Sequence, residues 1–313
     1  MAKTASKLSA YRVLAFNTET NTGEEMTLSA SDAVIDAIDP EITPDNNTVE
    51  RQGTTPGPRS GVPGAPTGSI KFSAMLTGSG SETPPRLANV LACCGLKLAA
   101  GVLTPLAATE VGDTGTFGLY KAGRYHSLYG VMLDATFKGE AGKPVMIEFN
   151  GKGLRSVSGL TKWRDVAMVS PTYLPVLPPT LKDVTVTVDG TAICLPGFEL
   201  ALGNEVKLRQ CMTAASGHLA AQVMNWKNRR ITLMPEAVAY SARDWMTAYE
   251  SQTVFPLSMT IGTEENNTII ITDDGLTLAE PPVDNDDGGI YRDKLVFMTS
   301  DDFEIEFEIT EEA

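Results

Sequence analysis

The chain has 313 residues, of which 42% are hydrophobic and 20% charged, a balance typical of a globular protein and a length sufficient for two domains. No apolar run approaches the roughly 20 residues that a membrane-spanning helix needs, and the first residues lack the apolar stretch of a signal peptide. We therefore expect a protein without membrane contact that is assembled in a cytoplasm. The 28 glycines and 19 prolines indicate many turns, which favours short strands.

The net charge of −14 is confined to the second half of the chain. Residues 1–165 carry 16 basic and 16 acidic side chains, whereas residues 166–313 carry 9 basic and 23 acidic ones. This second half is not suited to gripping nucleic acid, because tight binding to phosphates needs clustered cations. A simpler alternative is that the acidity maintains solubility.

A long segment rich in Pro, Gly, Thr and Asn follows the first predicted strand, and its second part covers about residues 38–67. Loops of this length without secondary structure are uncommon in compact domains and are usually functional or disordered. One alternative is a surface insertion. The interpretation we favour is a loop that becomes ordered by packing onto a neighbouring subunit. Its candidate contact residues are Asp39, Arg51, Arg59 and Pro63.

The rest of the first half predicts a strand, a helix and a hairpin in that order. Alternating polarity indicates a strand at 70–74. A helix is expected over 83–95, with Thr83 as its cap and Gly95 as its terminator. Its apolar stripe is formed by Leu87, Val90, Leu91 and Cys94. Strands at 127–137 and 144–150, joined by the turn KGEAGK, form the predicted hairpin.

The second half repeats this order of elements. A strand is predicted at 230–234 and a helix at 241–249, where Ser241 and Asp244 resemble a capping box. A hairpin of 254–261 and 267–272 follows. Further strands are indicated by VTVTV (184–188) and FEIEFEI (303–309), in which apolar and polar residues alternate. We interpret the repetition as two copies of one fold. The domains are 1–167 and 183–313, separated by a proline-rich linker at 168–182.

No pattern in the sequence nominates an enzyme or a cofactor site. The phosphate loop and the nucleophile elbow are both missing. The two histidines, His126 and His218, are far apart in sequence, and a structural role is the better interpretation. The spacing of the four cysteines suits neither a zinc site nor a disulfide framework, so we expect buried free thiols. These cysteines are Cys93, Cys94, Cys194 and Cys211.

Two charged clusters are candidates for binding sites. The run DNDDGG offers Asp284, Asp286 and Asp287 as weak candidates for a calcium ligand set. A helix–loop–helix calcium site would require glutamate where Leu295 stands, so a solvated acidic turn is favoured. The basic cluster of Lys227, Arg229 and Arg230 lies in the acidic half, and a strand edge or subunit contact explains it better than nucleic-acid binding.

In residues 11–155 a strand, a long loop, a second strand and a helix follow one another, and an "aGkP" turn then leads into a glycine-containing strand. The residues of this pattern are Gly130, Ala141, Gly142, Lys143, Pro144, Phe149, Gly151 and Gly153. By this pattern residues 11–155 resemble the major tail tube protein of long-tailed, siphovirus-like bacteriophages. Residues 183–313 resemble the same family more weakly, as a second copy.

The resemblance implies a mainly β fold with two tandem tail-tube-like β-sandwich or barrel domains, each flanked by a short α-helix. Such domains form rings of six, so two domains per chain imply a trimeric ring with pseudo-sixfold symmetry; a hexamer is the alternative. The rings stack into a tube in the virion tail, through which DNA passes without specific binding. The resemblance also implies that the long loop at about 38–67 reaches the adjacent ring. The implied partners are further copies of the chain and the tape measure, tail terminator and distal tail proteins.

An acidic channel would repel DNA phosphates, and the candidate lumen residues are Glu304, Glu306 and Glu308. Other protein classes remain open from the sequence: a capsid decoration protein, a tail terminator or an adhesin-like β module. All of these are structural or binding proteins, and none requires catalysis.

Overall fold

The computed structural model describes residues 12–29, 32, 37–45, 48–49, 62–78, 80–81, 83–107, 109–121, 124–155, 164–165, 176–180, 184–212, 214, 218–224, 228–239 and 242–309. In the first half the strands are β1 (Arg12–Thr18), β2 (Ile38–Pro44), β3 (Thr48–Val49), β4 (Val62–Pro63), β5 (Thr67–Met75), β6 (Leu96–Ala99), β7 (Val102–Pro105), β8 (Gly115–Lys121), β9 (Arg124–Glu140), β10 (Met146–Leu154) and β11 (Arg164–Asp165), and the helix is α1 (Arg86–Ala92).

In the second half the strands are β12 (Val184–Val188), β13 (Thr191–Ala192), β14 (Gly197–Ala201), β15 (Glu205–Gln210), β16 (His218–Met224), β17 (Arg230–Leu233), β18 (Phe255–Ile261), β19 (Ile269–Leu278), β20 (Val283–Asp287), β21 (Ile290–Met298) and β22 (Glu304–Phe307), and the helix is α2 (Trp245–Glu250). All strand pairings with a recorded register are antiparallel, which suits the short connections between neighbouring strands.

The first half forms two packed layers that share one long strand. One layer has the order β1–β8–β9 and the other the order β2–β5–β10–β9. β9 spans 17 residues and passes from one layer to the other. At the transition Gly130 has a φ of +59°, a conformation that glycine adopts without strain.

The second half has the same pairing order. Its layers are β12–β18–β19 and β14–β17–β21–β19, and β19 passes between them as β9 does. A register shift occurs at the same place in both halves. In the first half the flanking pairs are Gly115–Val131 and Phe117–Leu128, and in the second half they are Phe255–Leu276 and Leu257–Asp273. The repetition predicted from the sequence is therefore present in the strand order.

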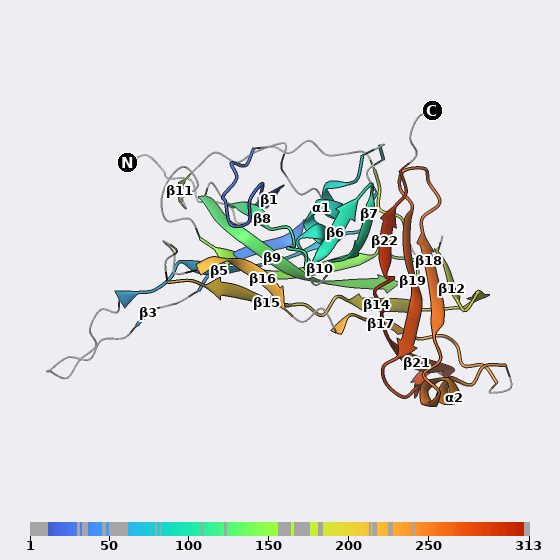
Figure 1. Ribbon diagram of the computed structural model, residues 1–313. Coiled ribbons are helices and arrows are strands. Elements are labelled where there is room, and N and C mark those ends of the chain that lie inside the picture. Colours follow the sequence, from blue (N-terminus) through green and yellow to red (C-terminus); the bar gives the residue numbers. More distant parts are fainter. Residues whose placement is uncertain are drawn as a thin grey trace.

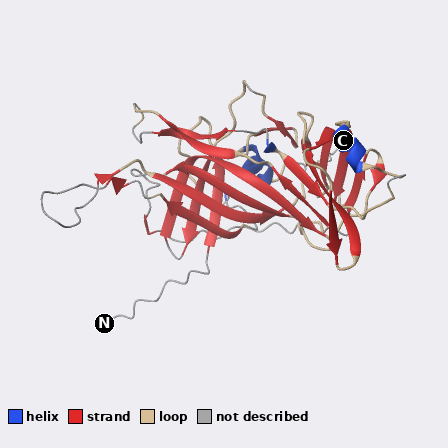
Figure 2. Cartoon of the chain, turned by 90° about the horizontal axis from the view of Figure 1, so that it is seen from below, coloured by secondary structure: helices blue, strands red, loops and turns tan. Residues whose placement is uncertain are grey.

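The two halves are joined into one β network (Figures 1 and 2). β14 pairs with β9, which produces one continuous sheet with the order β2–β5–β10–β9–β14–β17–β21–β19. We call this the long sheet. β22 pairs with β7 of the first half, and β7 pairs with β6. The main hydrophobic core contains residues of both halves, so the layers do not end at the proposed boundary between the domains.

The predicted strands at 70–74, 127–137, 144–150, 184–188, 230–234, 254–261, 267–272 and 303–309 are confirmed as β5, β9, β10, β12, β17, β18, β19 and β22. The correspondence that we predicted between hairpins is wrong. The counterpart of β9–β10 is β19–β21, and the counterpart of β18–β19 is β8–β9. A strand pair that follows a helix is too general a pattern to identify its counterpart.

Both predicted helices exist, but their caps differ from the prediction. α1 begins at Arg86 after Pro85 and has no side-chain cap, so Thr83 does not cap it. In α2 Asp244 is itself the N-cap, and its carboxylate accepts hydrogen bonds from the N–H and Oγ1 of Thr247 (3.0 and 2.8 Å). Both helices are short, so the packing of their apolar faces holds them in place.

Only residues 176–180 of the predicted linker are described. There the Asn267 side-chain amide donates to the Leu177 carbonyl (2.9 Å), and Thr180 forms a bridge with Pro144. The described part of the linker therefore contacts both halves. The remainder of 168–182 lies outside the described residues.

Candidate functional site

The two halves meet edge to edge where β14 pairs with the C-terminal part of β9. In this ladder Gly197 to Ala201 lie opposite Glu140 to Thr136. At its ends the Leu202 N–H donates to the Ala135 carbonyl (3.0 Å), and the Ala141 N–H donates to the Pro196 carbonyl (2.8 Å). The joint shows how one copy of the repeated fold extends the sheet of another copy.

The counterpart of β14 in the first half is β2, and its outer edge is open. Among the described residues β2 pairs with β5 alone. The Asp45 N–H donates to the Thr67 carbonyl (3.0 Å). Because backbone groups of alternate residues point to opposite sides of a strand, those of Ile42 and Pro44 face away from β5. Pro44 has no N–H, so the Ile42 N–H is left as an outward donor on an edge that can pair with another strand.

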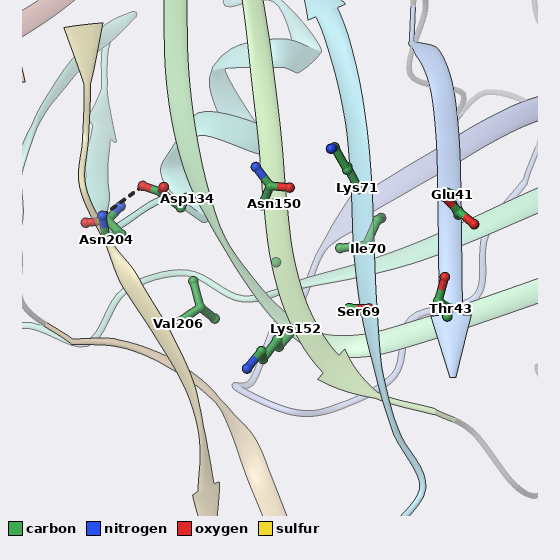
Figure 3. A pocket seen from close by; sticks show the side chains of 11 residues that line it. Glu41, Thr43, Ser69, Ile70, Lys71, Asp134, Asn150, Lys152, Asn204 and Val206 are labelled. Atoms are coloured by element: carbon green, nitrogen blue, oxygen red, sulfur yellow. Dashed lines mark hydrogen bonds between the residues drawn. The ribbon is translucent and has the colours of Figure 1, made fainter. Parts of the chain in front are cut away.

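The face of the long sheet opposite the core carries a polar hollow of about 440 Å³ (Figure 3). Strands β2, β5, β9 and β10 form its floor, and the start of β15 forms one wall. Its lining consists of Glu41, Thr43, Ser69, Ile70, Lys71, Asp134, Asn150, Gly151, Lys152, Asn204 and Val206. This lining includes no histidine, cysteine or aromatic ring, and it therefore favours a contact surface over a reaction site.

Asn204 ties the wall of this hollow to its floor. Its N–H donates to Asp134 Oδ1 (2.8 Å), and its side-chain amide donates to the Cys94 carbonyl (2.6 Å). Burial raises the pKa of Asp134, and the hydrogen bond from Asn204 partly opposes this shift. The contacts fix the chain at the point where it leaves β14 for the β15–β16 hairpin.

Charges of both signs alternate on this outer face. Lys138 Nζ lies 2.8 Å from Glu148 Oε2, and this hydrogen bond raises the pKa of Lys138. Glu199 on β14 stands opposite Lys138 across the joint. The acidic side chains on the outer face of β2, β9, β10 and β14 are Glu41, Asp134, Glu140, Glu148 and Glu199. The basic ones on β5, β9, β10, β17 and β21 are Lys71, Lys138, Lys152, Arg230 and Lys294. The two signs are balanced.

The three glutamates predicted to line a channel lie together on another part of the structure. Glu304, Glu306 and Glu308 are exposed and alternate with buried Ile305 and Phe307. β22, which carries the first two, pairs with β19 and β7 and is not a strand of the long sheet. The structure thus separates these glutamates from the β9–β14 joint and from the open edge of β2.

The predicted acidic turn is formed by the β20–β21 hairpin. Asp286 Oδ1 accepts a hydrogen bond from the Gly289 N–H (2.7 Å), which closes the turn, and Asp284 is exposed. The side chain of Asp287 lies outside the described residues. Within the described part of the chain, no three His, Cys, Asp or Glu side chains are arranged to hold a metal ion.

The structure tests the predicted contact loop only in part. Asp39 is exposed in β2 with a φ of +47°, and its Oδ1 lies 3.5 Å from an Arg12 guanidinium nitrogen. Pro63 belongs to β4, where it stands opposite Thr48 of β3. Arg51 and Arg59 lie outside the described residues. The role of these four residues in subunit contact stays a prediction.

The cysteines are free, but only two of them are buried. Cys93 and Cys94 lie at the end of α1, where burial raises the pKa of both thiols well above the ordinary value. Cys194 is exposed and Cys211 is partly exposed, so the prediction of a buried thiol is wrong for these two. Both lie in connections beside β13 and β15, where the sequence has no apolar periodicity.

The two histidines, Arg229 and Arg230 lie in strands or beside them and have contacts typical of structural residues. His126 is partly buried in β9, where burial and the nearby Arg124 lower its pKa, and His218 begins β16. Arg229 is buried, and its guanidinium lies 4.9 Å from the centre of the Phe303 ring. Arg230 pairs with Glu280 (2.6 Å), and Lys227 lies outside the described residues.

Sequence reasoning missed β14, although it forms the joint. The segment GFELAL does alternate, since Phe198, Leu200 and Leu202 are buried and Glu199 and Ala201 are not fully buried. Period-two alternation was therefore available as a signal. Its partner, β9, is more than fifty residues away in the chain, and nothing in the segment itself indicates that pairing.

The fold is that of a β-sheet protein whose repeated unit extends its sheet by edge pairing. The chain matches the model of the phage tail tube protein family over residues 10–308, and it belongs to that family. It is a structural subunit of a tail tube, its place is the virion tail, and it is not an enzyme. No curated protein matches the chain. No helix among the described residues has the length and apolar character to span a membrane.

Proposed function

We propose that three copies of this chain close into a ring with six repeated units, through which DNA passes. The observation that supports the proposal is the β9–β14 joint, in which the first half adds to the second within one chain. The same joint can repeat between chains, because β2 is the counterpart of β14 and pairs with β5 alone within the part of the chain that the structure describes. A head-to-tail contact that closes produces a ring.

The partner of β2 in the next copy is the edge formed by the end of β19 and by β20. β19 is the counterpart of β9, and Leu133 and Leu278 hold the same position in the two pairing patterns. β9 continues beyond Leu133 into the stretch that pairs with β14. The chain beyond Leu278, which includes Pro281 and Pro282, is the corresponding edge. Prolines on both facing edges limit pairing with unrelated strands.

In this ring the long sheet lines the channel. Only the long sheet can continue through every joint. The other strand contact between the halves, β7–β22, depends on the β6–β7 hairpin that follows α1. No such hairpin follows α2, because only a few residues connect α2 to β18. In a ring the inner layer has the shorter circumference and must close, whereas the outer layer can contain gaps. The continuous long sheet therefore belongs in the inner layer. The face of the long sheet opposite the core, with its balanced charges, then faces the DNA. Glu304, Glu306 and Glu308 face away from the DNA.

A charge-balanced channel has a physical advantage. Clustered cations would release counterions from the DNA and hold it. The pairing of Lys138 with Glu148 and Glu199 neutralises a cation that would otherwise meet phosphates. We propose that the rings assemble into tubes in the host cytoplasm and that the other tail proteins are their partners. The long-tailed, siphovirus-like type of phage is part of the same proposal.

Electron microscopy of the purified full-length protein at high concentration tests the ring. We expect rings or tubes whose cross-section has three-fold symmetry and six similar densities. Native mass spectrometry should find a species of three times the 33.4 kDa chain mass. A ring of six chains with twelve densities, or a protein that stays monomeric when a tail initiator complex is added, would overturn the trimer.

The orientation of the long sheet is tested by labelling assembled tubes. The variants Lys71→Cys and Glu306→Cys are compared, with exposed Cys194 and partly exposed Cys211 replaced by serine. Both positions are exposed in the single chain. A bulky maleimide polymer should label position 306 in tubes and position 71 only after the tubes are dissociated. Equal labelling of both positions in intact tubes would contradict a channel lined by the long sheet.

A backbone variant tests the edge of β2. Ile42→Pro removes the outward N–H and should prevent ring formation, while Ile42→Val keeps this donor and should form rings. Thermal unfolding of both monomers separates a loss of assembly from a loss of folding. Rings formed by a folded Ile42→Pro protein would show that β2 is not the joining edge.

A further inference from the structure

Within the chain, the β15–β16 hairpin of the second half lies on the first half. Val223 and Ala221 of this hairpin form a small apolar cluster with Met132 of β9, and all three are buried. The hairpin also approaches the backbone at Gly130, where an added Cβ would lie 3.2 Å from the Ala220 Cβ. This is a second contact between the halves, separate from the β9–β14 joint.

The surface that corresponds to this docking site in the second half is uncovered in the single chain. Met132 pairs with Lys152 in the first half, and the counterpart of that pair is Thr277 with Met298. Met298 is 41% exposed, although it is a large apolar side chain. Thr277 is only partly buried. The apolar cover that Met132 receives from the hairpin therefore has no counterpart here within the described residues.

The hairpin that corresponds to β15–β16 in the first half is β3–β4. Each of the two hairpins connects counterpart strands: β14 to β17 in one half and β2 to β5 in the other. Their registers agree as well. Val206 stands opposite Val223 in β15–β16, and Val49 stands opposite Val62 in β3–β4. The same pair of valines thus occurs at the same place in both hairpins.

We propose that the β3–β4 hairpin of one copy docks on the Thr277–Met298 surface of a second copy in the same ring. The proposal rests on the ring described above and names a contact that the ring alone does not require. The in-chain contact supplies the template, since Val223 packs against Met132 there. The β3–β4 hairpin then covers Met298 as the β15–β16 hairpin covers Met132. The base of the long loop is thus a clamp between neighbours within a ring.

Cross-linking of the full-length protein tests this contact. Val62→Cys and Met298→Cys are introduced together, with Cys194 and Cys211 replaced by serine, and the assembled protein is treated with a short bis-maleimide. We expect chains joined into dimers and trimers on a denaturing gel, with loss of the monomer band. Either cysteine alone should leave the monomer band unchanged.

The matched control pairs Val62→Cys with Glu306→Cys, an exposed position on β22 away from the long sheet. This control should give no joined chains. Rings that form without a 62–298 cross-link, or with equal cross-linking in the control, would overturn the docking contact and leave the ring in place. A failure to form rings at all would overturn both proposals, and microscopy of the same sample distinguishes the two results.

Discussion

The two halves share one strand order but fill their interiors with different residues. In the first half the rings of Phe16 and Phe117 lie 4.8 Å apart, and those of Phe72 and Phe149 lie 4.7 Å apart. The counterparts of these four phenylalanines in the second half are aliphatic. They are Val188, Leu257, Leu233 and Leu295.

The lost volume is replaced elsewhere in the second half. Phe255 and Phe297 pack edge to face with Trp245 of α2 at 5.5 and 6.1 Å. Their counterparts in the first half are Gly115 and Gly151. Large residues have thus exchanged places with small ones while the backbone pairing stayed the same. Strand order depends on polarity pattern and register, whereas close packing is solved separately in each half.

The largest effect is expected when the second-half cluster loses an aromatic ring. Phe297 is fully buried on β21, so Phe297→Ala should leave a cavity and lower the free energy of unfolding by about 3–5 kcal/mol. Urea unfolding of the monomer measures this loss. Ile290→Ala, on the same strand but 47% exposed, is the matched control and should change stability much less. Equal losses would show that the aromatic cluster is not the packing centre of this half.

Adding a side chain at one of the first-half glycines should lower the stability by a smaller amount. The cause is overpacking and not a cavity. An added Cβ at Gly115 would lie 2.5 Å from a carbon of the Phe16 ring. We expect Gly115→Ala to cost about 1–3 kcal/mol, the usual range for overpacking. Combining it with Phe16→Leu should recover part of the loss, as measured in a double-mutant cycle. Purely additive losses would contradict an exchange of volume between the two positions.

Both halves also hold a buried carboxylate at the glycine where the shared strand changes layers. Glu19 accepts hydrogen bonds from the N–H groups of Gly23 and Gly130 (2.8 and 2.6 Å) and from the hydroxyls of Thr114 and Thr116 (2.6 and 2.9 Å). Every partner is a donor. A side chain that offers only acceptor oxygens to these four donors suits this site.

In the second half Asp273 accepts from the Gly275 N–H (2.8 Å) and from the N–H and hydroxyl of Ser300 (2.9 and 2.7 Å). Gly275 is the counterpart of Gly130, so the two halves reach one solution with residues from different places in the repeat. Sequence alignment of the halves alone would not pair Glu19 with Asp273.

We expect Glu19→Gln to destabilise the protein by about 1–3 kcal/mol, because the amide NH₂ must face donors that it cannot bond. Asp273→Asn should have an effect of similar size, since it also replaces an acceptor by a donor. Unfolding in urea at neutral pH measures both. A loss of stability in only one of the two variants would show that the two carboxylates do not have the same structural role.

The sequence predicted most strands of this fold because their burial alternates. In β22 Ile305 and Phe307 are buried and alternate with exposed glutamates, and in β12 the buried Val186 and Val188 alternate with threonines that are not buried. β8 was missed because its residues 115–120 are all buried, and a continuous buried run shows no period of two. The register of the repeat was missed because the exchange of Gly151 for Phe297 conceals the similarity of β10 and β21.

The candidate site was less predictable than the fold. Exposed acidic residues such as Glu306 could be identified from alternation, but their layer depends on the pairing of β22 with β7, a contact between opposite ends of the chain. The open edge of β2 is likewise defined by what does not pair with it. Properties of single strands can be read locally, whereas the faces and edges of a sheet depend on every pairing in it.

The smallest expected effect concerns a charge that only the first half has. Burial raises the pKa of Asp134 above its ordinary 3.8. The counterpart of Asp134 in the second half is the uncharged Ala279, which follows Leu278 as Asp134 follows Leu133. In the folded protein the carboxyl group therefore holds its proton to higher pH than in the unfolded chain. Stability falls as pH rises from 3.8 through the raised pKa, because ionisation of the buried group becomes a cost.

Asp134→Asn removes this titration, so the stability of the variant should rise relative to that of the wild type over that pH range. Unfolding in urea at several pH values measures the difference, and Asp134→Ala, which also removes the acceptor for the Asn204 N–H, separates the charge from the hydrogen bond. A difference that does not change with pH would show that the ionised form carries no cost at this position.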